Sequence, residues 1–247
     1  MNPGHVWFFI REYLFPHGCG ICGRILINRI EAWYGLCDEC RAKLNRDDSC
    51  GQGCCDLCGR PLISENQRCL SCRENTETPF YHKMFALFPY TGIFRRLLGA
   101  FKFGKSLGAG HFLADKLLEA LNQLPLEEME NPVLIPVPPR PGKIRKTGWD
   151  QMESLSRLIE PMLRKQHDKS PALRRCLRRQ ASQTQKKLDR KGRRTNLKGR
   201  ISARGKVPKD CILFDDVITT GSTINACAAA LKEAGAERIF GICLFYD

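Results

Sequence analysis

Residues 211–226 read CILFDDVITTGSTINA, an apolar run that meets two acids and then a loop rich in hydroxyl side chains. The apolar run is short enough for a buried strand, and apolar residues recur behind the loop at helical spacing from Ile224 to Leu231. The stretch therefore predicts a strand, a tight loop around Gly221 and the start of a helix. Free N–H groups and the positive end of the helix dipole at such a start favour a phosphate dianion.

The side chains of this loop fit a phosphorylated sugar. Gly221 lets the backbone approach a ligand closely, and the hydroxyl groups around it can donate hydrogen bonds. Asp215 and Asp216 can accept hydrogen bonds from the vicinal hydroxyls of a sugar, or help to hold Mg²⁺ through water. A phosphate site beside a diol site predicts phosphorylated ribose. The alternative is an ordinary strand-to-helix turn with capping residues, and a Walker-type loop is excluded because no Gly-Lys-Ser/Thr is present.

The stretch resembles the PRPP-binding motif of the type I phosphoribosyltransferases. The resemblance implies that Asp215 and Asp216 are the acids of the catalytic site and contact the ribose 2′ and 3′ hydroxyls. It also implies that residues 217–223 wrap the 5′-phosphate and that PRPP binds together with Mg²⁺. The ligand-binding residues expected in this loop are Val217, Thr219, Thr220, Gly221, Ser222 and Thr223.

A second loop with basic side chains, residues 138–143, directly follows a short apolar stretch at 133–137 that predicts a strand. Basic side chains after a strand suit an anionic ligand. In the resembling enzymes the corresponding loop grips pyrophosphate, which makes Arg140 a candidate ligand-binding residue. A rigid proline-rich turn is the alternative, and the residues alone leave both open.

Cysteine usage divides the chain of 247 residues into two parts, because ten of its fourteen cysteines fall between Cys19 and Cys72. We expect an N-terminal helix and a small double zinc ribbon in residues 1–76. An α/β domain is expected in residues 77–247. By the resemblance, this domain is a phosphoribosyltransferase-like parallel-sheet domain.

The cysteines carry an internal repeat. CGICGRILI at 19–27 returns as CDLCGRPLI at 55–63, and CDECR at 37–41 returns as CLSCR at 69–73. Two Cys-x-x-Cys knuckles complete a tetrahedral Cys₄ shell with no position left for water, so two structural Zn²⁺ sites are predicted. The expected ligands are Cys19, Cys22, Cys37 and Cys40 in the first ribbon and Cys55, Cys58, Cys69 and Cys72 in the second. Cys54 could replace Cys55, and an iron–sulfur cluster or a redox dithiol is the competing use of such cysteines.

We infer the cellular compartment from two kinds of segment that are not found in the sequence, a membrane span and a cleavable signal peptide. No stretch is apolar over transmembrane length, and no small-residue cleavage site follows the apolar residues 6–10. We therefore expect a cytoplasmic protein without a membrane span. A reducing compartment argues against disulfide bonds as the use of the clustered cysteines.

The positive charge is concentrated in one segment. Residues 174–206 hold fourteen Lys and Arg against one acid, a net of +13 in a chain whose net charge is +14. Such a block attracts polyphosphate or nucleic acid through counterion release, which predicts single-stranded DNA as a partner. The alternatives are a surface loop with no partner and a lid over the neighbouring loop, as in type I phosphoribosyltransferases.

The whole chain resembles the ComF family. The features that carry this resemblance are the cysteine ribbons, the Asp-Asp-Val-x-Thr-Thr-Gly-Ser-Thr loop, the segments at 15–16, 101–104, 136–138 and 148–151, and a basic segment with Gln183, Thr184, Gln185, Leu188, Arg194 and Asn196. The family implies bacterial proteins associated with DNA uptake during natural competence, with DNA-uptake or recombination proteins as further partners. Where the family often has Arg-Gly-Phe-Asn-Gln, this chain has Thr-Gly-Trp-Asp-Gln at 147–151, which replaces a cation and an amide by a hydroxyl and a carboxylate.

Three functions from different classes fit these features. The first is a PRPP-binding protein that handles DNA, and it is favoured by the altered residues at 147–151 and by the expectation that no C-terminal hood selects a base. The second is a true phosphoribosyltransferase that transfers ribose 5-phosphate to a nitrogen base and releases pyrophosphate. The third, a zinc-ribbon adaptor for nucleic acid with an inert α/β domain, fits least because the ribose-phosphate loop is chemically intact.

Overall fold

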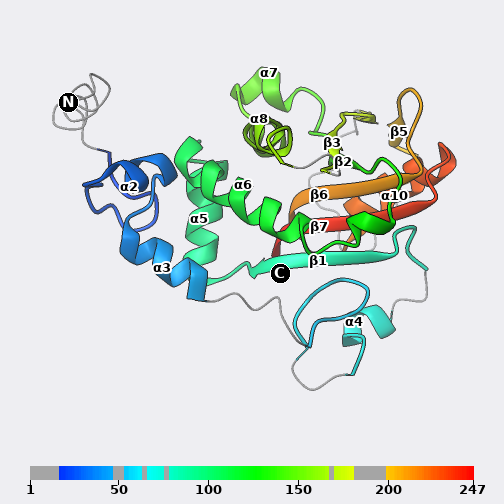
Figure 1. Cartoon of the computed structure of the whole chain (residues 1–247), viewed down its shortest axis with the longest axis horizontal. Coiled ribbons are helices and arrows are strands. Elements are labelled where there is room, and N and C mark those ends of the chain that lie inside the picture. Colours follow the sequence, from blue (N-terminus) through cyan, green and yellow to red (C-terminus); the bar gives the residue numbers. More distant parts are fainter. Residues whose placement is uncertain (1–16, 47–52, 63–65, 75–77, 167–169, 181–198) are drawn as a thin grey trace.

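The computed structural model describes residues 17–46, 53–62, 66–74, 78–166, 170–180 and 199–247. Its centre is a parallel five-stranded sheet in the order β1-β7-β6-β2-β3, beside a small antiparallel pair, β4 and β5 (Figure 1). The predicted α/β class with a parallel sheet is confirmed. The strands are β1 (Lys83–Pro89), β2 (Val133–Pro136), β3 (Ala172–Leu173), β4 (Leu177–Arg179), β5 (Ile201–Ala203), β6 (Asp210–Ile218) and β7 (Arg238–Tyr246).

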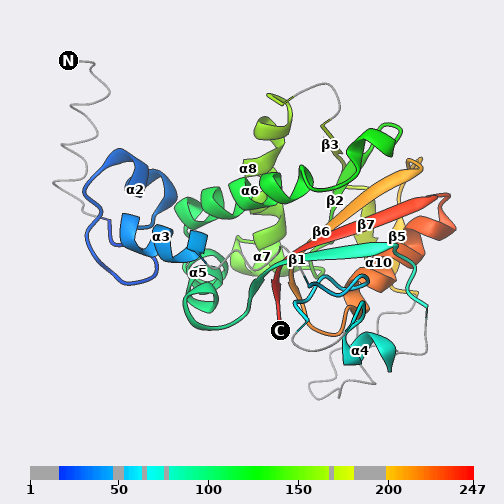
Figure 2. The same ribbon diagram turned by 60° about the horizontal axis from the view of Figure 1, so that its bottom comes forward.

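Helices cover both faces of this sheet. The helices are α2 (Arg29–Tyr34), α3 (Asp38–Arg46), α4 (Leu70–Arg73), α5 (Gly92–Lys102), α6 (Leu107–Leu121), the 3₁₀ turn η1 (Leu126–Glu128), α7 (Lys143–Thr147), α8 (Gln151–Leu163) and α10 (Ser222–Glu233). Figure 2 shows α5, α6 and α8 on one side of the sheet and α10 on the other. Among the described residues, none of these helices has the length and apolar content that a membrane crossing requires.

The central strand β6 explains why the sequence around 211–214 is continuously apolar. Ile212 and Phe214 pack into the core cluster beneath α5, α6 and α8, whereas Cys211 and Leu213 pack into the cluster beneath α10. Successive side chains of a strand point to opposite faces, and a parallel sheet covered on both faces buries all of them. This register carries the acids that follow to the carboxyl edge of the sheet.

The first ribbon, residues 17–46, packs against α6. A Cβ atom on Gly108 would lie 2.4 Å from the backbone nitrogen of Gly35, so only glycine permits this approach. The Tyr34 hydroxyl donates a hydrogen bond of 2.6 Å to Asp115. The Trp33 ring stacks on His111 at a centroid distance of 3.9 Å.

The second ribbon, residues 53–62 and 66–74, lies against the edge strand β1. Figures 1 and 2 both show the part that carries α4 beside β1 and away from α2 and α3. The N–H of Met84 donates to the carbonyl of Leu57 at 2.9 Å, which fixes the ribbon to the strand edge. The predicted boundary between residues 76 and 77 lies outside the described residues and stays a prediction.

Candidate functional site

The two acids of the predicted ribose site lie side by side near the carboxyl end of β6. The strand continues beyond them to Ile218, so they belong to the strand itself. Each is only 8% exposed. In the described part of the chain, Asp215 accepts a single hydrogen bond, at 2.9 Å from the Asp216 N–H to its Oδ1. No side-chain amide or cation of the described residues donates to it, in contrast to its neighbour.

Asp216 is held in place by two side chains from other elements. Its Oδ2 accepts hydrogen bonds from Lys102 Nζ at 2.9 Å and from Gln151 Nε2 at 2.7 Å. Its Oδ1 accepts from the N–H of Val217 at 2.9 Å. Sequence reasoning did not assign these contacts to Lys102 or Gln151, although both lie in segments that carry the ComF resemblance. These contacts join residues that are far apart in the chain, so no local sequence pattern predicts them.

The electrostatics of the pair differ from those of two solvated acids. Burial raises the pKa of Asp215 well above its usual range, the negative charge of Asp216 raises it further, and Lys102 partly opposes both effects. Two adjacent buried carboxylates favour sharing one negative charge unless a cation approaches. The repulsion between the two carboxylates is therefore reduced when a cation or a set of sugar hydroxyls binds at this edge of the sheet.

The loop after the acids has the geometry that the sequence predicts. Gly221 has a positive φ of 71° and precedes α10 without contributing a side-chain cap. Two other long helices on this sheet, α6 and α8, begin with a capping side chain, Ser106 and Asp150, whereas α5 has none, like α10. A helix start without such a cap leaves N–H groups available to an anion. The structure brings the loop residues Val217, Thr219, Thr220, Gly221, Ser222 and Thr223 together here, with the Thr220 and Ser222 hydroxyls 2.7 Å apart.

Arg140 lies in the exposed loop after β2, the strand next to β6. The carboxyl ends of adjacent parallel strands meet at one edge, so this loop neighbours the acid pair. Burial lowers the pKa of Arg179, and the positive charge of Arg140 lowers it further, whereas the charge of Asp215 opposes both. Two arginines from different segments thus lie close to the acids.

The altered residues at 147–151 have a structural use. Asp150 accepts hydrogen bonds from the N–H groups of Met152 and Glu153 and so caps α8. It also accepts a hydrogen bond of 2.7 Å from Lys143, which bonds to Gln151 as well. The carboxylate therefore orients the start of α8, where Gln151 reaches Asp216.

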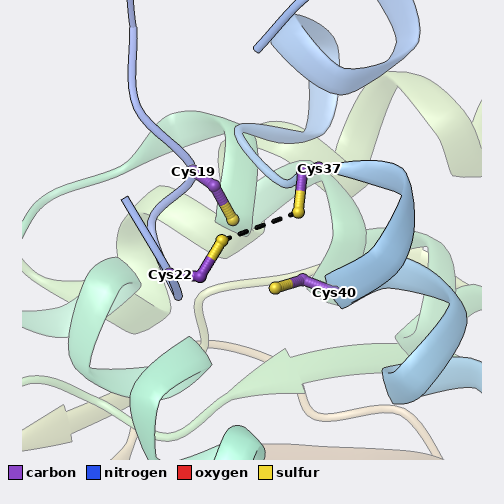
Figure 3. A group of neighbouring side chains, drawn as sticks. All are labelled: Cys19, Cys22, Cys37 and Cys40. Carbon is purple, nitrogen blue, oxygen red and sulfur yellow. Dashed lines mark hydrogen bonds between the residues drawn. The ribbon is translucent and has the colours of Figure 1, made fainter. Parts of the chain in front are cut away.

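The first cysteine cluster is drawn in Figure 3. The sulfurs of Cys19, Cys22, Cys37 and Cys40 point toward one another and all lie within 4.8 Å of each other. The Cys22 and Cys37 sulfurs are 3.7 Å apart. A tetrahedral Zn–Cys₄ centre with Zn–S bonds of about 2.3 Å has S–S edges of about 3.8 Å, whereas a disulfide bond measures about 2.05 Å. The donor set and spacing therefore fit Zn²⁺.

The second cluster repeats the first. Its sulfurs come from Cys55, Cys58, Cys69 and Cys72 and also lie within 4.8 Å of one another. The Cys58 and Cys69 sulfurs are 3.7 Å apart, the same edge as in the first ribbon. Of the two adjacent cysteines that the sequence left open, Cys55 is in this cluster and Cys54 is not. Two Cys₄ clusters of this kind fit structural zinc sites.

Backbone geometry prepares one thiol in each ribbon for a metal. Burial raises the pKa of Cys19, but hydrogen bonds from backbone N–H groups, first that of Cys37, bring it down to about 7. Burial likewise raises the pKa of Cys55, and N–H groups, first that of Cys58, bring it down to about 7. The thiolate is the form that binds a metal, so the fold lowers the cost of reaching it.

Glu31 is a buried acid that the sequence reasoning did not single out. Its Oε2 accepts from the N–H of Ile27 at 2.7 Å, and its Oε1 accepts from the N–H of Asp38 at 2.8 Å and from Arg24 at 3.3 Å. It thereby ties the segment after the first knuckle to the second knuckle. No spacing rule distinguishes it from a surface glutamate.

Several sequence predictions fall on residues that the structure does not describe. These include the Phe-Pro pair at 15–16 and the basic segment's Gln183, Thr184, Gln185, Leu188, Arg194 and Asn196, and residues 1–16, where an N-terminal helix would begin, are not described either. The described ends of the basic segment form β4 and β5, which pack on α10. The four cysteines at 176, 211, 227 and 243 are buried in the core.

Comparison with known proteins finds one matching family model and several similar proteins. The family model of the double zinc ribbon domain matches residues 10–75. Competence protein F of Haemophilus influenzae is 30% identical over 216 residues, which cover 83% of this chain and 87% of that protein. The chain belongs to the ComF family. The predicted order, a small double zinc ribbon followed by an α/β domain, is thus confirmed.

Two further relatives extend the comparison for this ComF family member. The DNA utilization protein YhgH of Escherichia coli O157:H7 is 26% identical over 228 residues, which cover 91% of the chain and 96% of that protein. A ribose-phosphate pyrophosphokinase of Buchnera aphidicola is 44% identical over 54 residues, which cover 22% of the chain and 17% of that enzyme. The likeness to the enzyme is local, whereas the likeness to YhgH spans nearly the whole chain.

Proposed function

We propose that this ComF family protein binds phosphorylated ribose, with PRPP and Mg²⁺ as the ligand pair, and acts in DNA uptake or DNA handling in the cytoplasm. One observation carries the ligand assignment. The acid pair at 215–216 and a helix start without a side-chain cap belong to the same short connection at the centre of the sheet. The first suits a diol and the second suits a phosphate, the two groups that ribose 5-phosphate combines.

The available atoms give each acid a different part in this proposal. No side-chain amide or cation of the described residues donates to Asp215, so it is the acid that would accept from a ribose hydroxyl or share Mg²⁺ with the phosphates. Asp216 already accepts hydrogen bonds from Lys102 and Gln151, which fix the orientation of its carboxylate. It would use its remaining acceptor capacity for the second ribose hydroxyl. Mg²⁺ would neutralise the pyrophosphate and the acid pair together.

The role in DNA uptake rests on the family and on charge. Relatives carry the names competence protein F and DNA utilization protein. The basic segment at 174–206 brings the charge that a nucleic-acid backbone attracts. DNA-uptake or recombination proteins are the partners that this role implies.

A true phosphoribosyltransferase is the second candidate. It is favoured by Arg140, because the loop that carries it follows the strand next to the acid pair and is placed to meet a pyrophosphate group. Pyrophosphate release from PRPP in the presence of a panel of free nitrogen bases distinguishes the two candidates. Release with one base establishes the transferase, and no release by a protein that binds PRPP leaves the binding function.

Calorimetric titration of the zinc-loaded protein with PRPP, with and without Mg²⁺, tests the ligand. The parent should bind, and the double variant Asp215→Asn with Asp216→Asn should lose binding while keeping its fold. Glu237→Gln is the matched control, since it removes an exposed charge at the opposite edge of the sheet. Ribose 5-phosphate should bind about tenfold more tightly than 2-deoxyribose 5-phosphate, because about 1.4 kcal/mol is lost with one hydroxyl contact. Unchanged affinity in the folded double variant would sink the ribose assignment.

The DNA part has its own test. Arg178 and Arg204 are exposed on β4 and directly after β5, within the basic segment. Replacing both with alanine should weaken binding of single-stranded DNA and flatten its dependence on salt by about 0.7 per lost phosphate contact in log K against log salt. Absence of DNA binding by the parent at low salt would contradict this part alone.

A further inference from the structure

The two zinc ribbons share an arginine after the first knuckle, but this arginine makes different contacts in each ribbon. Each first knuckle is followed by Gly-Arg, at residues 23–24 and 59–60. In the first ribbon, Arg24 stays within its own ribbon and pairs with Glu31 at 3.3 Å and with Glu39 at 3.8 Å. The second ribbon has Ser71 at the position of Glu39. Arg60 thus lacks one of the acids that hold its counterpart.

Arg60 instead reaches out of its ribbon. Its Nη2 donates a hydrogen bond to the backbone carbonyl of Thr219, the first hydroxyl residue of the ribose-phosphate loop. Its Nε is buried and has no hydrogen-bond partner among the residues that the structure describes. The two residues are 159 positions apart, so this contact connects two otherwise separate parts of the fold. The guanidinium group also places a positive charge beside the loop that is proposed to bind a phosphate, and this charge would attract the phosphate.

The metal knuckle fixes the backbone of Arg60. The N–H of Cys55 donates to the carbonyl of Arg60 at 2.8 Å, and the N–H of Gly59 donates to the carbonyl of Cys55 at 2.9 Å. Cys55 is itself one of the four clustered cysteines. Any change at the metal is therefore transmitted to Arg60 through one hydrogen bond.

The knuckle is also pressed against β1. A Cβ atom on Gly59 would lie 2.5 Å from the carbonyl oxygen of Met84, whereas a Cβ atom on its counterpart Gly23 would meet nothing within 4 Å. On the far side of the contact, the N–H of Phe80 donates to Asn225 in α10 at 2.8 Å. Figure 2 shows the ribbon segment with α4 below the sheet, on the side of α10. The second ribbon is thus held against β1, and the segment between the ribbon and β1 is held by α10.

We propose that Arg60 is a positioning residue for the ribose-phosphate loop, so that Zn²⁺ in the second ribbon, and not in the first, sets the order of this loop and its affinity for phosphorylated ribose. The affinity part rests on the proposed function. The loop part does not, because it concerns the conformation of residues 217–223 without any ligand. Zinc in the second ribbon then has two roles, as a structural ion and as a condition for ligand binding.

Hydrogen exchange of the ligand-free, zinc-loaded protein tests the loop part. Arg60→Ala should speed exchange of the amides in 217–223 about tenfold, whereas Arg24→Ala should leave them unchanged and affect the first ribbon. Arg60→Lys should restore part of the protection, because an ammonium group can also donate to the Thr219 carbonyl. Both alanine variants should retain two zinc ions. Equal exchange of the loop in the Arg60→Ala variant and the parent would overturn the proposal.

A glycine pair gives an independent variant that leaves both arginines in place. Gly59 and Gly23 have similar positive φ values, 72° and 78°, so an alanine at either position carries similar backbone strain. Only Gly59→Ala also pushes the ribbon off β1. Faster loop exchange in Gly59→Ala and not in Gly23→Ala supports the proposal, and equal loop exchange in the two variants contradicts it.

The affinity part is tested by removing one zinc at a time. Cys72→Ser and Cys40→Ser should each lower the zinc content by one ion, but only Cys72→Ser should weaken PRPP binding, by about tenfold. Equal effects of the two variants would refute the special role of the second ribbon. If the parent binds no PRPP at all, the proposed function fails, and the exchange experiment alone decides whether Arg60 positions the loop.

Discussion

Lys102 Nζ lies 2.9 Å from Asp216 Oδ2, although the two residues are 114 positions apart in the chain. Lys102 ends α5, where a cation also complements the helix dipole. Its side chain is partly exposed, whereas that of Asp216 is largely buried. The acid pair is therefore supplied with one permanent positive charge before any metal or ligand arrives.

Replacing Lys102 with methionine should destabilise the protein. The change leaves two adjacent buried carboxylates without their counter-charge and further raises the pKa of Asp215, which Lys102 now lowers. A carboxyl group whose pKa is raised by folding binds more protons in the folded state, so the stability of the variant should fall as the pH rises. We expect a loss of about 1–3 kcal/mol at neutral pH, seen by thermal unfolding at several pH values. Lys43→Met, at an exposed ion pair, is the control and should change little.

Replacing Asp215 with asparagine should stabilise the protein while removing its ligand. The pKa of this acid is raised by burial, so its ionisation opposes folding above the pKa of about 3.9 that it has in the unfolded chain. The variant should gain about 0.5–2 kcal/mol at pH 7. The gain should shrink as the pH falls toward 4 and vanish below about pH 3, where the parent acid is protonated in both states. A melting temperature that drops at pH 7 would contradict this account of the burial.

The sequence could predict those parts of the site whose residues lie close together in the chain. The acids, Gly221 and the hydroxyl residues follow one another in the chain, and their chemistry defines a ribose-phosphate loop before any coordinates are known. The zinc clusters were predictable for a similar reason, since each knuckle is a local turn and the repeat shows which knuckles belong together. Spacing alone could not separate Cys54 from Cys55, because both fit a knuckle of slightly different width.

The parts that sequence could not predict are contacts between distant segments. Lys102 and Gln151 reach Asp216, and Arg60 reaches Thr219, across separations that only the packed fold closes. From sequence, Asp150 is a departure from the family pattern that replaces an amide by a carboxylate. The structure gives it a local use as the cap of α8 and the partner of Lys143.

The contact between the first ribbon and α6 should tolerate no added methyl group. Gly108→Ala would place a Cβ atom 2.4 Å from Gly35, so the ribbon must shift, at a cost of about 1–3 kcal/mol. Gly99→Ala is the matched control, because this glycine is also helical and its Cβ would meet nothing within 4 Å. That variant should gain about 0.5–1 kcal/mol. Chemical denaturation of both variants measures the difference, and equal stabilities would show that the ribbon does not pack this closely.

Zinc content distinguishes the clustered cysteines from their neighbour. Cys58→Ser removes one sulfur of the second Cys₄ cluster and should reduce the metal content from two ions to about one, as measured by native mass spectrometry. Each structural zinc contributes about 10–16 kcal/mol of binding free energy in small zinc modules, so the second ribbon should also lose protection from proteolysis. Cys54→Ser is the control: its sulfur lies outside the cluster, and the variant should keep both ions. Loss of one zinc ion in Cys54→Ser would instead move the ligand set to the wider knuckle of Cys54 and Cys58, and Arg60 would then no longer be fixed by a metal ligand.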